Sequence, residues 1–271
     1  MKNIFLFAII LLLVLLILLY MYRIRSFQKR QIQNNITTNI ITHIPKVITM
    51  CNKTKKIPKY IIDNWQKLNP DYQIEIYDDE DCINFLMKHF GQEYVDIFNY
   101  IKDGPIKCDF WRVCKLYIDG GVYTDVDVKP LIPIKDFLEN DVNFLTCVSH
   151  EIGNMNPHFV ICPAKHHVNK KAIDIYLTYY RSGYEYNYWG WSIVYVYANI
   201  FKNMFGKSIT EEGIYVYNLN NNKEKYQFLK EIKPNHSREK PGDPYDVYCT
   251  YKNQIVLYNR YRDYDSTLHT F

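Results

Sequence analysis

The stretch IKCDFWRVCKLYIDGGVYTDVDVKPL, residues 106–131, joins a helical pattern to a strand pattern through two glycines. Residues 106–119 are predicted to form a helix, and Gly120 and Gly121 supply its C-terminal stop. The aromatic and β-branched residues that follow predict a strand over residues 121–127. The double glycine lets the chain reverse between them, so the end of the strand is expected to return to the beginning of the helix.

Two carboxylates one residue apart, Asp125 and Asp127, end this predicted strand. Side chains alternate along an extended segment, so both would point to the same side about 6.6 Å apart, where they could share one hard cation. The alternative is an exposed turn, in which aspartate is common.

A second pair of opposite charge, Asp109 and Arg112, lies near the start of the predicted helix. Residues three apart are neighbours on a helix surface, and the returning strand would place the aspartate pair beside them. The alternative is a surface ion pair that contributes only about 0.2–0.5 kcal/mol.

The rest of the chain alternates between strands and helices, which indicates an α/β domain over residues 44–271. Strands are predicted at 45–50, 72–78, 143–148 and 158–163, and helices at 58–68, 80–90, 93–100, 170–182 and 192–205. The last sixty residues are rich in turn residues and carry no clear pattern.

Residues 1–22 are predicted to be an N-terminal transmembrane anchor, followed by a basic flank and polar stem over 23–43. The uncharged run Ile4–Tyr22 would span roughly 28 Å as a helix, close to the thickness of a bilayer core. A cleaved signal peptide is the alternative, but this run is longer than its usual apolar region and no small-residue cleavage site follows.

The net charge of +4 resides in this N-terminal part of the chain, because residues 44–271 carry a formal charge of −1. A nearly neutral domain argues against a broad nucleic-acid surface. The seven cysteines show no C-x-x-C motif and no Cys/His spacing typical of zinc sites, so most of them are expected to be core thiols.

The stretch at 106–131 resembles the core of the sugar-binding-region D-x-D glycosyltransferases, a family that includes yeast initiation mannosyltransferases and, more distantly, clostridial glucosylating toxins. The residues in register with the family pattern are Asp109, Arg112, Gly120, Gly121, Tyr123, Asp125 and Asp127. The similarity extends upstream through IPKVI (44–48) and NWQKLNPDYQIEIYDD (64–79), and fades past HFVICPAKHH.

This resemblance implies a GT-A fold, which is a single Rossmann-like domain that binds a nucleotide sugar. It also implies a UDP- or GDP-sugar donor, Mn²⁺ or Mg²⁺, and retention of anomeric configuration. The implied location is an ER or Golgi-type secretory membrane with the domain in the lumen, whereas the basic residues behind the predicted anchor favour the cytosol.

The site expected from this resemblance contains five residues. Asp127 is expected to bind the metal directly, and Asp125 to bind it through water or to hold the donor's ribose. The family implies that Asp109 accepts hydrogen bonds from the donor sugar and that Arg112 stabilises the sugar–phosphate region. Tyr123 is either a site residue or a strand aromatic.

Departures from the family pattern affect the base contacts and the metal shell. Asn52 stands where the family often has a tryptophan after its first strand. The candidates for a third metal ligand are His236, Ser237 and His269. The pairs His166–His167 and Trp189–Trp191 are expected to be loop or packing residues, although the tryptophans could stack on an acceptor sugar.

The sequence therefore predicts a membrane-anchored glycosyltransferase that moves a hexose or N-acetylhexosamine to a glycan or glycolipid acceptor. One alternative is a metal-dependent phosphoester hydrolase, which normally needs more Asp and His ligands than this stretch supplies. The other is a non-catalytic sugar-binding protein.

Overall fold

The computed structural model describes residues 19–23, 43–220, 222–233 and 247–259. Contacts group the chain into two units, residues 1–43 and residues 44–271. Residues 19–23 are helical, and the rest of the predicted anchor and stem up to residue 42 lies outside the described residues. Among the residues described, no helix is both long and apolar enough to span a bilayer.

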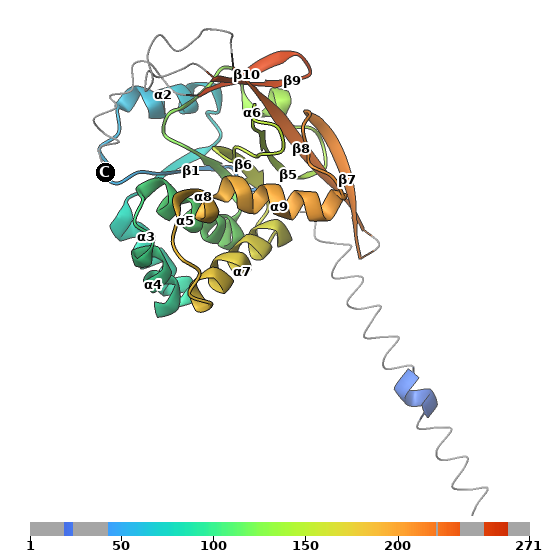
Figure 1. The fold of residues 1–271 in the computed structure, drawn as a ribbon. Coiled ribbons are helices and arrows are strands. Elements are labelled where there is room, and N and C mark those ends of the chain that lie inside the picture. The colour runs from blue at the N-terminus through green and yellow to red at the C-terminus, as the bar shows by residue number, and fades with distance from the viewer. Residues whose placement is uncertain (1–18, 24–42, 221, 234–246, 260–271) are drawn as a thin grey trace, which may run out of the picture. The chain divides into compact units, whose positions relative to one another are not determined.

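The second unit is built on a mixed sheet in which ten strands are described, in the order β2-β1-β3-β6-β5-β8-β9-β10-β4 with β7 beside β8 (Figure 1). Strand β1 (Val47–Cys51) pairs in parallel with both β2 (Gln73–Tyr77) and β3 (Gly121–Thr124). Strand β6 (Phe159–Cys162) runs antiparallel to β3 on its other side. The remaining strands are β4 (Val128–Pro130), β5 (Val142–Val148), β7 (Gly213–Leu219), β8 (Asn222–Ile232), β9 (Val247–Tyr251) and β10 (Gln254–Asn259).

Helices cover both faces of the sheet, and each face has its own apolar core (Figure 1). Helices α2 (Lys59–Leu68) and α6 (Ile134–Phe137) contribute to the core on one face. The other face is covered by α3 (Asp79–Phe90), α4 (Gln92–Tyr100), α5 (Gly104–Asp119), α7 (His167–Arg181), α8 (Tyr188–Trp191) and α9 (Ile193–Phe205). This arrangement confirms the predicted mixed α/β class.

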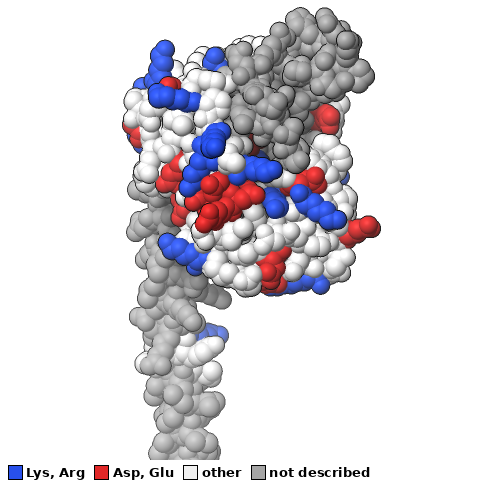
Figure 2. Space-filling model, turned by 90° about the vertical axis from the view of Figure 1, so that its left-hand side faces the viewer, with Lys and Arg blue, Asp and Glu red and all other residues white. Residues whose placement is uncertain are grey.

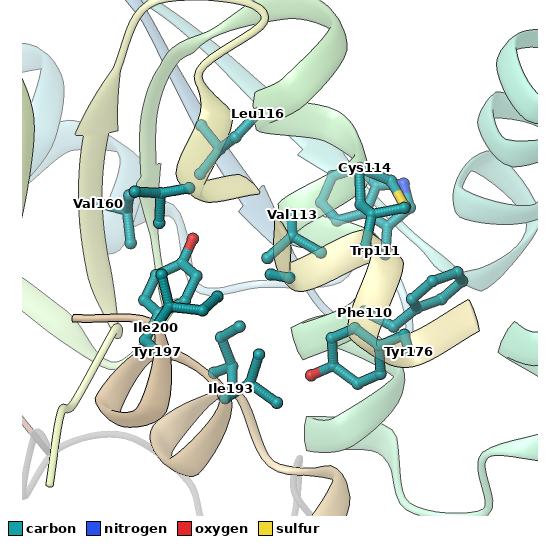
Figure 3. Packing of buried hydrophobic residues seen from close by; sticks show 14 of the residues in the cluster. Phe110, Trp111, Val113, Cys114, Leu116, Val160, Tyr176, Ile193, Tyr197 and Ile200 are labelled. Atoms are coloured by element: carbon teal, nitrogen blue, oxygen red, sulfur yellow. The ribbon is translucent and has the colours of Figure 1, made fainter. Parts of the chain in front are cut away.

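Helix α5 lies among the helices on this second face of the sheet, and most of its residues are buried. Figure 3 shows Phe110 and Val113 of α5 packed with Tyr176 of α7 and with Ile193 and Tyr197 of α9. The rings of Phe110 and Tyr176 meet edge to face at 5.3 Å between centroids. Three charged residues of this helix, Asp109, Arg112 and Lys115, are therefore held inside the protein.

The predicted helices are present, with their first residues shifted by one to three positions and their last residues by at most one. Helix α3 begins at Asp79 because the Asp78 carboxylate accepts from the amide of Asp81 and the Asp81 side chain accepts in return, a capping box. Helix α5 begins two residues earlier than predicted, with Pro105 in its first turn.

The C-terminal part departs most from the sequence expectation, because β7–β10 are all strands there. The β9–β10 hairpin turns at Lys252 and Asn253, which both have positive φ angles (50° and 62°), and the β7–β8 turn includes Asn220 at 48°. Such turns normally contain glycine, so a lysine and two asparagines gave no clear hairpin signal.

The double glycine is required by close packing as well as by the turn. Gly120 has φ 67°, and a Cβ there would lie 2.4 Å from the amide nitrogen of Ala164. Gly121 has φ 95°, and a Cβ there would lie 2.9 Å from the carbonyl oxygen of Val47. The two glycines therefore let the chain enter β3 between β1 and the end of β6.

The face shown in Figure 2 carries Lys and Arg side chains interspersed with Asp and Glu. Opposite charges pair in several exposed places, such as Lys55 with Asp81 at 2.7 Å and Arg181 with Glu93 at 2.7 Å. The described residues of this face therefore form no continuous basic surface.

Candidate functional site

The two aspartates lie on a turn at the carboxyl end of β3. The strand ends at Thr124, and the amide of Val128 donates to the carbonyl of Asp125 at 3.2 Å, which closes a four-residue turn. The prediction that the strand continues to Asp127 is wrong, because the chain turns away to pair β4 with β10. The alternating-strand argument for their spacing therefore does not apply.

Asp125 is held in one orientation while about a third of its side chain (32%) is exposed. Its Oδ1 accepts a hydrogen bond from the Tyr123 hydroxyl at 2.7 Å and lies 3.2 Å from Nη2 of Arg112. Its amide donates to the carbonyl of His158 at 2.9 Å. The turn is thus fixed through both its backbone and its side chain.

Tyr123 is fully buried in β3, and its hydroxyl also lies 2.9 Å from Sγ of Cys108. Burial raises the pKa of this hydroxyl well above its usual value, so it remains a hydrogen-bond donor. Tyr123 is therefore both a buried strand aromatic and a residue that contacts Asp125. Its position agrees with both roles considered from the sequence.

Arg112 connects the helix to the turn. Its Nη2 lies 2.8 Å from Oδ1 of Asp109, its Nη1 donates to the carbonyl of Pro157 at 2.5 Å, and its guanidinium lies 4.3 Å from the centre of the Tyr123 ring. Burial lowers the pKa of Arg112, but the neighbouring carboxylates, led by Asp125, outweigh it and the pKa stays well above the usual value. The alternative of a surface ion pair is wrong, because both partners are buried.

Asp109 links α5 to the beginning of α9. Its Oδ2 accepts from the amide of Ile193 at 3.0 Å and from the Ser192 hydroxyl at 3.5 Å. A carboxylate at a helix N-terminus is favourable because the amides there lack partners within the helix. Burial raises the pKa of Asp109 to about 6, against the opposing effect of Arg112.

Asp127 lies half-buried at the third position of the turn. Two carboxylates on one turn provide the hard oxygen ligands that Mg²⁺ and Mn²⁺ prefer, so the residues fit a divalent ion. In the described part of the chain, no third His, Cys or acidic side chain forms a close ligand group with this pair. His236, Ser237 and His269 lie outside the described residues.

The end of β1 lies at the same edge of the sheet as the turn. The parallel register places Thr49 beside Tyr123, so Cys51 is level with Asp125 and Asn52 follows. Asn52 makes a local contact, because its side-chain amide donates to the carbonyl of Thr54 at 2.9 Å. Ligands of open α/β sheets bind beyond the carboxyl ends of such parallel strands.

A hollow of about 600 Å³ lies at the opposite edge, beside the start of β1. Its lining includes Lys115, whose ammonium group contacts Glu75 at 3.1 Å and Asp119 at 2.9 Å. The charges of Lys115, Glu75 and Asp119 are thus already paired with one another, and we place the candidate site at the turn instead.

The two tryptophans of the predicted pair have different environments. Trp191 is fully buried among aromatic rings such as Tyr100 and Tyr176, whereas 59% of Trp189 is exposed. Helix α8, which carries both, directly precedes the Ser192–Ile193 segment that contacts Asp109. Of the two, only Trp189 therefore has a ring face accessible for stacking on an acceptor sugar.

The histidine pair packs as expected. The rings of His166 and His167 stack at 4.8 Å, and Nε2 of His167 lies 2.9 Å from the Glu224 carboxylate and 2.6 Å from the Tyr226 hydroxyl. Burial lowers the pKa of His166 to about 3, so its ring is neutral.

Two backbone carbonyls of the site were missed by sequence reasoning. Those of Pro157 and His158 hold Arg112 and the amide of Asp125, as described above. A carbonyl is common to every residue, so only the antiparallel pairing of β6 with β3 reveals that this segment lies beside the turn.

With this geometry established, comparison with known proteins becomes informative. Residues 57–144 match the family described as "Glycosyltransferase sugar-binding region containing DXD motif". This segment carries the D-x-D glycosyltransferase sugar-binding region. The match confirms the family resemblance found in the sequence, and it includes α5, β3 and the turn.

Two curated relatives support the same assignment. The initiation-specific alpha-1,6-mannosyltransferase of Candida albicans is 30% identical over 92 residues, which is 32% of this chain and 24% of the relative. The uncharacterized glycosyltransferase L373 of Acanthamoeba polyphaga mimivirus is 34% identical over 76 residues, which is 28% of this chain and 30% of the relative. The chain thus matches less than a third of the length of either protein.

Among solved structures, the chain resembles one described as PaToxG Glycosyltransferase, with a TM-score of 0.42 and 18% sequence identity. The alignment covers 66% of this chain and 79% of that chain.

Proposed function

We propose that this protein is a retaining, metal-dependent glycosyltransferase of the GT-A type. It would transfer a hexose or N-acetylhexosamine from a UDP- or GDP-sugar to a glycan or lipid acceptor. The observation that carries this proposal is the fixed turn at the carboxyl end of β3, where Asp125 is oriented by Tyr123 and Arg112 and is still partly exposed.

The chemistry of glycosyl transfer suits these groups. When the bond between sugar and phosphate breaks, negative charge grows on the departing nucleoside diphosphate. A divalent ion held by Asp125 and Asp127 would neutralise that charge. Arg112 keeps Asp125 and Asp109 in place, and its fixed positive charge lies in the same site.

The contacts that Asp109 makes within the protein restrict its role more than the family resemblance implies. Both of its oxygens already accept from the protein, at Arg112 and at the start of α9. We therefore propose that Asp109 acts chiefly by positioning Arg112 and α9, and that any contact with the donor sugar adds to these bonds.

A metal-dependent phosphoester hydrolase is less well supported. Such enzymes commonly use two metal ions and a larger set of carboxylate and histidine ligands. In the described part of the chain, the pair of aspartates has no such additional ligand beside it.

The test is a titration of the purified protein with UDP and GDP, with and without Mn²⁺, followed by a donor-hydrolysis screen over UDP- and GDP-sugars. We expect nucleotide binding that depends on the metal, and slow release of sugar from one donor. A sugar-binding protein without catalysis would bind but not turn over. Phosphate release from simple phosphoesters would instead support the hydrolase.

Two variants, Asp127→Asn and Asp125→Asn, test which aspartate binds the metal. Asp127→Asn should lower turnover by at least roughly a hundredfold, the scale seen when one preorganised electrostatic group is lost, and should abolish Mn²⁺-dependent nucleotide binding. Asp125→Asn should also lower stability, because buried Arg112 loses one of its two carboxylate partners. Normal metal-dependent turnover by Asp127→Asn would refute the metal site.

For the acceptor, we propose that Trp189 provides a stacking surface beside the site. Trp189→Ala should raise the acceptor KM while donor hydrolysis stays unchanged. An unchanged KM would exclude this role.

We further propose a secretory membrane as the location, by analogy with the yeast relatives, with the domain in the lumen. Protease treatment of intact microsomes decides the orientation. Digestion of the domain without detergent would place it in the cytosol, as the basic residues behind the predicted anchor favour.

A further inference from the structure

Three side chains that commonly bind metals meet directly behind the aspartate turn. They are Cys147 on β5, His158 just before β6, and Cys249 on β9, and all three are buried. Sγ of Cys249 lies 3.7 Å from Sγ of Cys147 and 3.3 Å from Nε2 of His158. All three ligand atoms lie within 4.8 Å of one another.

The two separations that involve Cys249 match edges of a zinc coordination tetrahedron. With Zn–S bonds of about 2.3 Å and Zn–N bonds of about 2.0 Å, tetrahedral angles place two sulfurs about 3.8 Å apart and a sulfur and nitrogen about 3.5 Å apart. The observed 3.7 Å and 3.3 Å are each within a few tenths of an ångström of these values.

We propose that Cys147, His158 and Cys249 supply three of the four ligands of a buried zinc ion, separate from the ion proposed at the aspartate turn. Charge favours zinc over other thiophilic ions. Two thiolates and a neutral imidazole balance the two charges of Zn²⁺, so the fully buried site is neutral, whereas Cu⁺ would leave it with an uncompensated negative charge.

The orientation of His158 supports this assignment. Its Nε2 faces Sγ of Cys249 at 3.3 Å, so this nitrogen can bind the same ion as the thiolate.

The other close ligand group, His166, His167 and Glu224, lacks this geometry. Nδ1 of His166 accepts a hydrogen bond from the amide of Val168, so the neutral ring carries its proton on Nε2, the nitrogen that faces Glu224. That nitrogen has no lone pair for a metal, and we assign no ion there.

A disulfide between Cys147 and Cys249 fits less well. Strand β8 lies between β5 and β9 in the sheet, so two strand spacings put the cysteine backbones roughly 9 Å apart, beyond the limit of about 7 Å for a disulfide. A metal ion can bridge this wider separation because its two bonds to sulfur lengthen the connection between the cysteine backbones.

The zinc ion would anchor the site proposed above. His158 contributes a ligand through its ring, while its carbonyl accepts the amide of Asp125 and the neighbouring Pro157 carbonyl accepts Arg112. Zinc would therefore tie β5, β9 and this segment together and keep the aspartate turn in place.

The experiment measures metal content by inductively coupled plasma mass spectrometry on the full chain purified in detergent and dialysed against EDTA. We expect about one zinc per chain in the wild type and in Asp127→Asn, and loss of most of it in Cys147→Ser and Cys249→Ser. Cys114→Ser, which replaces a buried thiol outside the cluster, is the matched control and should keep its zinc.

Two measurements on the wild-type protein test the proposal even if the cysteine variants fail to fold. Stepwise modification of the thiols with a mercurial should release zinc in proportion, and replacement with Co²⁺ should give a thiolate-to-cobalt charge-transfer band. Zinc-free wild-type protein, equal zinc in Cys249→Ser and Cys114→Ser, or a Cys147–Cys249 disulfide in non-reducing peptide maps would each overturn the proposal. None of these results depends on transferase activity.

Discussion

At the scale of single residues, Arg112 makes the most connections in the site. One guanidinium reaches Asp109, Asp125 and the Pro157 carbonyl and stacks on Tyr123. The planar fork makes these simultaneous bonds possible, and a lysine ammonium cannot reproduce them.

Arg112→Lys should therefore weaken both the fold and the reaction. Buried acceptors left without a donor cost about 1–3 kcal/mol, so we expect the melting temperature to fall by several degrees. Turnover measured well below that temperature should also fall sharply. Arg181→Lys, the same change in an exposed pair with Glu93, is the control and should leave both nearly unchanged. An unaltered melting temperature would show that the buried bonds contribute little.

Asp109 should give the protein a distinctive dependence of stability on pH. Its pKa is about 6 in the folded state, against 3.8 for the unperturbed group. Between these values the folded protein holds a proton that the unfolded chain has lost. The contribution of Asp109 is therefore fully present below about pH 4 and is lost as the pH rises through about 6, by at most roughly 3 kcal/mol.

Urea unfolding of the wild type and of Asp109→Asn between pH 4 and 7 tests this sign. The variant cannot titrate at this position, so the wild type should lose stability relative to it as the pH rises. Parallel curves, or a wild type that gains stability with pH, would contradict the raised pKa.

At the scale of elements, the junction between α5 and β3 depends on Gly120. Its positive φ angle alone would cost an alanine about 1–3 kcal/mol, and the added Cβ would also meet backbone atoms of Pro163 and Ala164 at 2.7 Å or less. Because β3 carries the aspartate turn at its other end, displacement here should also disturb the site.

Gly120→Ala is therefore expected to destabilise the protein by more than about 3 kcal/mol. Gly91→Ala is a matched control, because Gly91 also has a positive φ angle of 89° but no atom lies within 4 Å of its added Cβ. It should cost only the backbone strain, about 1–3 kcal/mol. Denaturant midpoints compare the two, and equal losses would show that backbone strain, not packing, determines the need for glycine.

At the scale of the whole molecule, residues 44–271 contain the sheet, both apolar cores and the candidate site. The first strand begins at Val47, with Ile44 packed against the core. A fragment that starts at Ile44 should therefore fold, stay in solution and bind nucleotide as the full chain does. An insoluble fragment beside a full chain that is active in detergent would show that residues 1–43 are needed for folding.

Much of the fold could be predicted from the sequence because it depends on interactions between residues that are close together in the chain. Helical periodicity, the cap at Asp78 and the glycine stop at Gly120 involve residues only a few positions apart. The same locality made the proximity of Asp109, Arg112 and Asp125 predictable, since a helix, a reversal and a strand of similar length bring their far ends together.

Only the tertiary structure decided the environment of these residues. The burial of Arg112, the turn in place of a strand at Asp127, and the carbonyls of Pro157 and His158 all depend on β6, α9 and β10 packing around the site. The meeting of Cys147, His158 and Cys249 likewise joins residues up to 102 positions apart, at spacings that match no sequence motif. Contacts at such separations are set by how the strands order within the sheet, which local periodicity does not encode.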